Sequence, residues 1–211
     1  MIDYKKVYIF HITHYGNLKS IFSNGFLCSD SFISKNNIQH TNISHLHIKH
    51  IRKNKPTPLG CTLSECVPFY FGILTPMLFA ISRNNVDGYA DGQKSVVYLV
   101  SNIQNVVNSN LEFCFSDGHA IEALTNFYTS LDDLQKLDFN AIRSKQWASC
   151  YQGIEEDFKR RKQSEFLVKG NFASDLFIGI AVFDENIKKI LEVSLNGLHH
   201  PPIEVLRDWY F

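Results

Sequence analysis

The sequence predicts an α+β fold in a single domain that spans residues 1–211. Short β-branched and aromatic segments recur along the chain, and irregular stretches separate them instead of regularly alternating helices. Hydrophobic residues make up 45% of the chain, which is enough to bury one core. The sequence has neither a Gly-x-Gly-x-x-Gly turn after a strand-like segment nor a P-loop, so we expect neither type of nucleotide site.

Strands are expected where β-branched and aromatic residues cluster, at Val7–Ile12, Val67–Phe71, Val96–Val100, Glu112–Phe115, Ser164–Val168, Phe177–Val182, Ile203–Val205 and Trp209–Phe211. Helical spacing or polarity predicts helices at Tyr15–Ser23, Ile43–Ile51, Pro76–Ile81, Asp117–Phe127, Phe139–Trp147, Tyr151–Gln163 and Glu185–Leu195. Gly25 suits the residue that ends the first helix, and Asp117 suits an N-cap.

The segment Cys28–Thr62 differs from the rest of the chain. It is rich in Asn, His, Ser and Lys, it contains Pro56 and Pro58, and only Ile43–Ile51 has helical periodicity. Long irregular excursions inside a small domain are commonly functional. We therefore expect a loop and a short helix that cover a ligand.

The net charge is zero, so a nonspecific nucleic-acid coat protein is disfavoured, although Lys49–Lys55 and Lys159–Lys162 are locally basic.

The cysteine content indicates the compartment. The five cysteines are irregularly spaced and no signal peptide is evident, which predicts a reduced, cytoplasmic protein. The apolar run Val67–Ile81 is interrupted by prolines and glycine, so no membrane span is expected. We expect a monomer.

Glu165 is the first candidate for chemistry. It lies between a basic run and an apolar run in the segment KRRKQSEFLVKG. A carboxylate at the start of a buried strand, close to cations, suits catalysis. From these residues alone, an edge-strand acid paired with Arg160 or Arg161 is the simpler alternative.

A metal site is the second possibility. His40, His45, His47 and His50 precede Cys61 and Cys66, and both residue types bind zinc. Their spacing fits no closed zinc-finger pattern, so we expect a polar loop and no metal. A Cys–His hydrolase is also disfavoured because no nucleophile elbow is present.

Five motifs in a fixed order resemble the DarT family, DNA ADP-ribosyltransferase toxins of DarT–DarG toxin–antitoxin systems. They are HITHYGNLKSIFSNGFL (His11–Leu27), VPFYFGILTPMLFAI (Val67–Ile81), FSDGHA (Phe115–Ala120), TNFYTSL (Thr125–Leu131) and RKQSEFLV (Arg161–Val168). The resemblance implies a PARP-like ADP-ribosyltransferase fold, with a central split antiparallel sheet and peripheral helices. It also implies NAD as co-substrate and no metal.

The resemblance implies roles for individual residues. Glu165 falls on the catalytic glutamate and Arg52 on the arginine beside NAD and the target base. Because guanidinium stays protonated, we expect Arg52 to hold phosphate or polarise the base, with proton loss shared between water and Glu165. NAD is expected to contact His11, Ile12, Thr13, His14 and Leu27. The segment from about Cys28 to Arg52 would cover NAD, and the segment from His119 to Glu165 would recognise the acceptor.

Expected DNA contacts follow from the same motifs and from residue type. His119 and Met77 belong to motifs placed near the DNA, while Phe69, Tyr70, Phe127 and Tyr128 offer stacking faces. Arg160 and Arg161, with Lys53, Lys55 and Lys162, could track phosphates.

The resemblance therefore implies a toxin that ADP-ribosylates a base of single-stranded DNA, with the thymidine branch of the family favoured and a DarG-type macrodomain antitoxin as partner. Two alternatives remain open at this point. The same chemistry could act on RNA or protein, or the fold could be a non-enzymatic nucleic-acid-binding domain.

Overall fold

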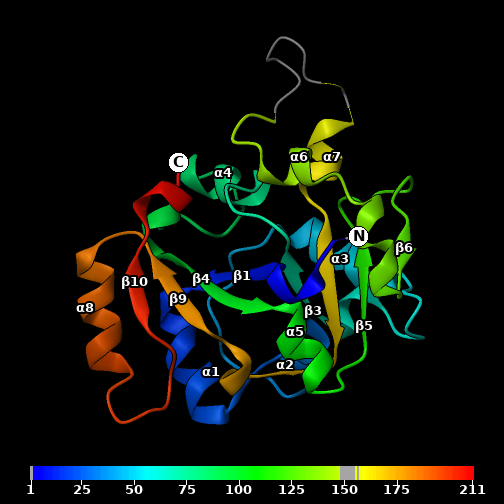
Figure 1. Cartoon of the computed structure of the whole chain (residues 1–211). Coiled ribbons are helices and arrows are strands. Elements are labelled where there is room, and N and C mark those ends of the chain that lie inside the picture. Colours follow the sequence, from blue (N-terminus) through cyan, green and yellow to red (C-terminus); the bar gives the residue numbers. More distant parts are fainter. Residues whose placement is uncertain (1, 148–154, 156) are drawn as a thin grey trace.

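A mixed β-sheet forms the centre of the molecule (Figure 1). The computed structural model describes residues 2–147, 155 and 157–211. In this part of the chain, eight strands pair in the order β10-β9-β4-β1-β3-β7-β5-β6. Their bounds are β1 Tyr8–His14, β3 Cys66–Tyr70, β4 Val96–Asn102, β5 Phe113–Ser116, β6 Phe127–Tyr128, β7 Glu165–Lys169, β9 Gly179–Val182 and β10 Ile203–Val205. A two-stranded sheet joins β2 (Phe26–Leu27) to β8 (Phe172–Ala173).

The sheet is split between β1 and β3. Strand β1 pairs with β4 along its whole length, and β3 pairs with β7 along its whole length. In contrast, β1 and β3 meet only at Phe10 and Tyr70. The expected split antiparallel sheet is therefore confirmed, with one departure, since β9 and β10 run parallel.

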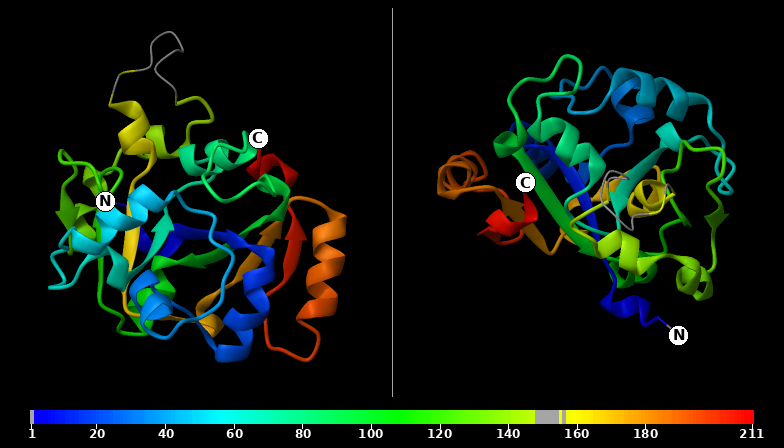
Figure 2. Two further views of the ribbon diagram at one scale, coloured as in Figure 1. Left: turned by 180° about the vertical axis from the view of Figure 1, so that it is seen from behind. Right: turned by 90° about the horizontal axis from the view of Figure 1, so that it is seen from above.

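The helices lie around this sheet. They are α1 Leu18–Asn24, α2 Asp30–Lys35, α3 Leu46–Asn54, α4 Pro76–Ser82, α5 Ile103–Asn108, α6 Phe139–Arg143, α7 Phe158–Lys162 and α8 Glu185–Ser194. Helices α1 to α3, blue to cyan, lie over one face of the sheet when the molecule is seen from behind (Figure 2). Helix α8 packs along β10 at one edge (Figure 1).

The core explains much of the aromatic content. Strand β4 is buried from Val96 to Ser101, and Tyr98 within it is fully inaccessible. On the other half of the sheet, Phe69 and Phe172 pack with their ring centroids 4.8 Å apart. Buried aromatic side chains of this size contribute a large share of the hydrophobic stabilisation of a small domain.

Several local predictions are confirmed. Helix α1 ends at Gly25, which has a left-handed φ of 81°. Helix α8 begins after Asp184, whose side chain accepts hydrogen bonds from the backbone amides of Asn186 and Ile187. Such caps satisfy amides that have no partner inside the helix, so the sequence around each boundary is enough to predict it.

Other local predictions were wrong. The expected helix at Asp117–Phe127 is a loop, because Asp117 accepts hydrogen bonds from the backbone and side chain of Asn126 and closes a turn. The C-terminal Trp209 ends a 3₁₀ turn instead of starting a strand. The segment Cys28–Thr62 has a second helix, α2, which was not expected. The side chain of Ser29 caps its N-terminus by accepting a hydrogen bond from the backbone amide of Phe32. Of the helix expected at Tyr151–Gln163, the first residues lie outside the described part of the chain.

Candidate active site

A cavity of about 650 Å³ opens where β1 and β3 diverge. One side is built from the end of β1 and from α1, α2 and α3. The other side is built from the loop after β5, from α7 and from the start of β7. The split in the sheet thus places residues that are far apart in the sequence around one volume.

Glu165 lies at the junction of the two sides. It is the first residue of β7, pairs with Tyr70 of β3, and is 3% exposed. Its Oε2 accepts a hydrogen bond from Arg52 Nη1 at 2.8 Å, and its Oε1 accepts one from the backbone amide of Ala120 at 2.9 Å. Both carboxylate oxygens are therefore oriented. The alternative pairing with Arg160 or Arg161 is wrong.

The Glu165 carboxylate is held in its charged form. Burial by itself would raise the pKa of Glu165, but Arg52, His119 and the Ala120 amide outweigh burial and lower it below its ordinary value. The pKa of Arg52 is raised, because the attraction of Glu165 outweighs the effect of burial. The two directions agree, so the pair is ionised at neutral pH.

Arg52 has a buried hydrogen-bond donor that is not used within the described part of the protein. Its side chain lies in the last turn of α3, lines the cavity and is 9% exposed. Its Nη1 is bonded to Glu165, whereas its buried Nη2 has no hydrogen-bond partner among the described residues. A buried charged donor without a partner is costly, so this atom is ready to bind an acceptor that enters the cavity.

The end of β1 provides polar groups on the opposite wall. His11 Nδ1 lies 2.8 Å from the carbonyl oxygen of Pro68 and must be its donor, which leaves Nε2 as an acceptor. Burial lowers the pKa of His11, so the ring is neutral. Ile12 and Thr13 also line the cavity, as does Leu27 of β2.

Asn17 is a cavity residue that the sequence did not single out. Its Nδ2 donates to Thr13 Oγ1 at 3.0 Å and to the Thr41 carbonyl at 2.9 Å, and its Oδ1 accepts from the Thr41 amide at 2.8 Å. Asn17 therefore fastens the segment before α3 to the end of β1. No local pattern distinguishes it from the other asparagines.

The segment Cys28–Arg52 forms part of the cavity wall, and its role as a cover over NAD stays a prediction. Residues from α2, from the following loop and from α3 line the cavity, among them Ile33, Ile38 and Ile48. Lys49 Nζ is 2.9 Å from Asp30 Oδ1 and joins α3 to α2. Because Asp30 and Arg52 line the same cavity, the wall is partly apolar and partly charged.

His14 is not among the residues that line the cavity, and its expected contact with NAD stays a prediction. Its Nδ1 accepts a hydrogen bond from the Gly16 amide, and its ring packs on Tyr15 with centroids 4.5 Å apart. Alternation along β1 puts His14 on the face opposite to His11 and Thr13.

Five of the expected DNA-contacting residues line the cavity, namely Phe69, Tyr70, Met77, His119 and Arg160. The Tyr70 hydroxyl donates to Met77 Sδ at 3.4 Å. Burial raises the pKa of Tyr70, and Glu165 raises it further, so the phenol stays protonated. Burial lowers the pKa of His119, so this imidazole is neutral at neutral pH.

Burial argues against two other expected DNA contacts, Phe69 and Lys162, whereas the contact expected of Tyr128 stays a prediction. Phe69 is 1% exposed, which leaves no ring face for a base. Tyr128 does not line the cavity and packs on Phe115 at the sheet edge. Lys162 is 2% exposed and donates to the carbonyls of Ile73 and Ile142, so it cannot follow a phosphate backbone.

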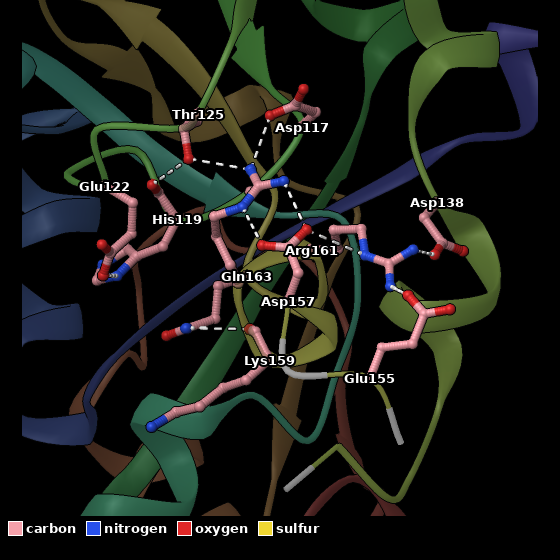
Figure 3. Close-up of polar contacts among 12 residues, drawn as sticks. Asp117, His119, Glu122, Thr125, Asp138, Glu155, Asp157, Lys159, Arg161 and Gln163 are labelled. Atoms are coloured by element: carbon pink, nitrogen blue, oxygen red, sulfur yellow. Dashed lines mark hydrogen bonds and ion pairs between the residues drawn. The ribbon is translucent and has the colours of Figure 1, made fainter. Parts of the chain in front are cut away.

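Arg160 and Arg161 are engaged in ion pairs within the protein, and Figure 3 shows Arg161 beside Asp138 and Glu155. Arg160 Nη1 is 2.9 Å from Asp117 Oδ1, and its Nη2 and Nε donate to Asp157. Arg161 Nη1 donates to Asp138 at 2.7 Å, and its Nη2 donates to Glu155. These carboxylates offset both charges, which weakens the expectation that either arginine tracks phosphates.

Lys159 and Arg160 are both basic residues of α7 that line the cavity, and the sequence did not separate Lys159 from its basic neighbours. The Nζ of Lys159 lies 5.8 Å from the centroid of the Trp147 ring. Within the described residues, no three His, Cys, Asp or Glu side chains are grouped so that they could hold a metal ion. Every helix in that part of the chain is too short or too polar to cross a membrane.

Comparisons with known proteins identify the family. A family model described as "ssDNA thymidine ADP-ribosyltransferase, DarT" matches residues 10–211. A "DNA ADP-ribosyl transferase" of Thermus aquaticus is 36% identical over 210 residues, covering 96% of this chain and 88% of the relative.

Two solved structures of Thermus sp. 2.9 DarT have closely similar folds. The complex with ADP-ribosylated ssDNA aligns with a TM-score of 0.88 and 31% identity over 97% of this chain and 96% of that chain. The complex with NAD+ aligns with a TM-score of 0.86 and 30% identity over 99% of this chain and 100% of that chain.

Proposed function

The chain belongs to the DarT family, and from that premise we propose that it transfers ADP-ribose from NAD onto a thymidine base of single-stranded DNA and releases nicotinamide. The observation that carries the proposal is the buried Glu165–Arg52 pair on the wall of a large cavity, with Arg52 Nη2 left without a partner among the described residues. Solved DarT relatives with NAD+ and with ADP-ribosylated ssDNA support it.

The cavity residues fit NAD. A volume of 650 Å³ lies within the range of sites for ligands of this kind. His11, Thr13, Asn17 and Leu27 would hold the nucleotide, and Arg52 Nη2 would bind an oxygen of it. When bound, NAD supplies a ribose carbon that becomes electrophilic as nicotinamide leaves.

The position and charge of Glu165 suit the transfer of ADP-ribose through that carbon. A charged carboxylate with both oxygens oriented can offset developing positive charge without having to reorganise during the reaction. Because Arg52 and the Ala120 amide keep Glu165 ionised, this stabilisation is available at neutral pH.

The acceptor base must lose a proton. Arg52 is a poor candidate to take it, because its pKa is raised and its guanidinium remains protonated. His119 is neutral and lines the same cavity, so we add it to water and Glu165 as a proton acceptor. Arg52 then acts as a donor to phosphate or to the base carbonyl.

Mass spectrometry of short oligonucleotides tests the proposal. Single-stranded DNA with and without thymidine, matched RNA, and the protein itself would be incubated with NAD. We expect an added ADP-ribose only on DNA that contains thymidine, and none with Glu165→Gln. An adduct confined to RNA or protein would support the alternative acceptors, and no adduct on any DNA would refute the proposal.

We further propose that the enzyme is a cytoplasmic toxin whose modification a DarG-type macrodomain antitoxin removes, and that it is a monomer. Family membership supports the toxin role. Induced expression in a bacterial host should stop growth with the wild type and not with Glu165→Gln. Coexpression of a macrodomain hydrolase should restore growth, and light scattering should give the mass of one chain, 24.3 kDa.

A further inference from the structure

Arg160 contacts both ends of the loop that carries His119, here called the His119 loop and defined as residues 117–126. At the start of the loop, Arg160 Nη1 is 2.9 Å from Asp117 Oδ1. At its end, the same nitrogen donates to Thr125 Oγ1 at 3.1 Å. The backbone carbonyl of Arg160 also accepts from the His119 amide at 3.0 Å. Figure 3 shows Asp117, His119 and Thr125, the three residues of the loop that make these contacts.

The contacts continue from Thr125 to Glu165 through one peptide group. Thr125 Oγ1 donates to the carbonyl oxygen of His119 at 2.8 Å. That carbonyl and the amide of Ala120 belong to the same planar peptide unit, so orienting one orients the other. The Ala120 amide donates to Glu165 Oε1 at 2.9 Å.

Arg160 is itself held in place. Asp157 accepts hydrogen bonds from its Nε and Nη2, and 17% of the side chain is exposed. Gly118 lies directly against it, since a Cβ on Gly118 would be 2.2 Å from Arg160 Nη1. The chain thus has a glycine where any side chain would displace the guanidinium.

We propose that Arg160 is a positioning residue that aims the Ala120 N–H at Glu165 Oε1 through Thr125 and the His119–Ala120 peptide. This inference rests on the proposed function, because Glu165 is the group that it positions. It replaces the expectation that Arg160 binds DNA phosphate. The Arg160 side chain acts inside the protein, on the wall that faces the acceptor.

Four variants test the chain of contacts at different points. Arg160→Ala removes the guanidinium, and Arg160→Lys keeps its charge without its planar set of donors. Thr125→Val keeps the shape of the threonine and removes its hydroxyl. Gly118→Ala keeps every charge and displaces Arg160. Lys189→Ala, on exposed α8, removes one positive charge far from the cavity and is the control.

The first readout needs neither DNA nor NAD. The carboxyl pKa of Glu165, followed by ¹³C NMR of labelled glutamate, should rise by about one unit in all four variants, the size expected for a lost hydrogen bond to a charged group. Lys189→Ala should leave it unchanged. A role in folding alone would lower the melting temperature without moving this pKa.

The second readout is transfer to DNA. In all four variants kcat should fall about 10-fold, the rate equivalent of that hydrogen bond, while KM for the oligonucleotide stays within a factor of about three. The salt dependence of oligonucleotide binding should not change, because Arg160 contacts no phosphate. If Arg160→Lys keeps wild-type kcat and the Glu165 pKa stays at its wild-type value, the inference is overturned.

Different results would refute the proposed function and the proposed role of Arg160. A wild type that modifies no DNA defeats the proposed function, while the NMR titration still decides whether Arg160 positions Glu165. If Arg160→Ala does not fold, Thr125→Val and Gly118→Ala carry the same test. An unchanged Glu165 pKa in both would overturn the inference.

Discussion

The two walls of the cavity are held together by different forces. On the cofactor side, which comprises the end of β1 and α1 to α3, neutral hydrogen bonds from Asn17 and an ion pair between Lys49 and Asp30 fasten the cover. On the acceptor side, Arg160 and Arg161 join the His119 loop, α6 and α7 through several ion pairs.

This difference fits the proposed function. A cover that admits and releases NAD would have to open, and a few neutral hydrogen bonds of about 0.5–1.5 kcal/mol each can be broken and remade. In the proposed role of Arg160, the acceptor wall keeps the Ala120 amide on Glu165, and networks of charged groups resist displacement better than isolated pairs. Glu165 is where the two walls meet.

The largest effect is expected at that meeting point. Glu165→Gln removes the charge that stabilises the transition state, so the rate of transfer should fall by about 10²–10³-fold or more. Quantitative mass spectrometry of the oligonucleotide product measures it. Glu112→Gln, which breaks an exposed pair with Lys169, is the matched control and should keep full activity. If Glu165→Gln transfers ADP-ribose at the wild-type rate, this carboxylate has no part in the reaction.

Arg52→Lys should have the next largest effect. A lysine can keep one contact to Glu165 but cannot also present the second donor of the guanidinium, so kcat/KM for NAD should fall about 10–100-fold. Steady-state nicotinamide release measures the change. Full activity would show that Arg52 Nη2 has no part in binding, and that the cofactor wall works without it.

Asn17→Ala tests whether the cover is fastened by neutral hydrogen bonds. Loss of the contacts to Thr13 and Thr41 should raise KM for NAD about 5–10-fold with little change in kcat, because the chemical groups are untouched. Asn108→Ala, at the exposed last residue of α5, is the control. A fall in kcat with an unchanged KM would instead assign Asn17 to the reaction step.

The smallest effect concerns stability and pH. The folded-state pKa of Glu165 is lowered from its ordinary 4.5, so the carboxylate stabilises the fold above about pH 4.5. This contribution to the free energy of unfolding is lost as the pH falls through the folded-state pKa of Glu165. Each unit of difference between the unfolded-state and folded-state pKa corresponds to about 1.4 kcal/mol of unfolding free energy. Urea unfolding of the wild type and of Glu165→Gln from pH 7 to pH 3 should show their difference shrinking with acid. A difference that grows would contradict the sign.

Several features could be predicted because their causes are local. Gly25 ends α1 because a left-handed residue is required there, and Asp184 begins α8 as an N-cap. The strands are predicted by β-branched and aromatic runs such as Val96–Val100. Glu165 is identified by its motif, although the same residues alone also allow a surface ion pair.

Other features depend on long-range contacts. Asp117 was expected to cap a helix, but Asn126 and Arg160 are its partners and they hold a loop instead. Phe69 could have faced a base, but packing on Phe172 buries it. Short polar residues can satisfy their hydrogen bonds in several ways, and only the assembled fold selects one of them.

The sequence by itself determined the α+β class and most of the strands, and it singled out Glu165 through the family motif. The tertiary structure alone decided that Arg52 lies against Glu165, that His14 is not among the residues lining the cavity, and that Arg160 contacts both ends of the His119 loop. The physical reason is the distance along the sequence over which each interaction acts. Backbone propensity and capping act over a few residues, whereas the charge state and orientation of Glu165 depend on Arg52 and Ala120, which only the split sheet and its loops bring beside it.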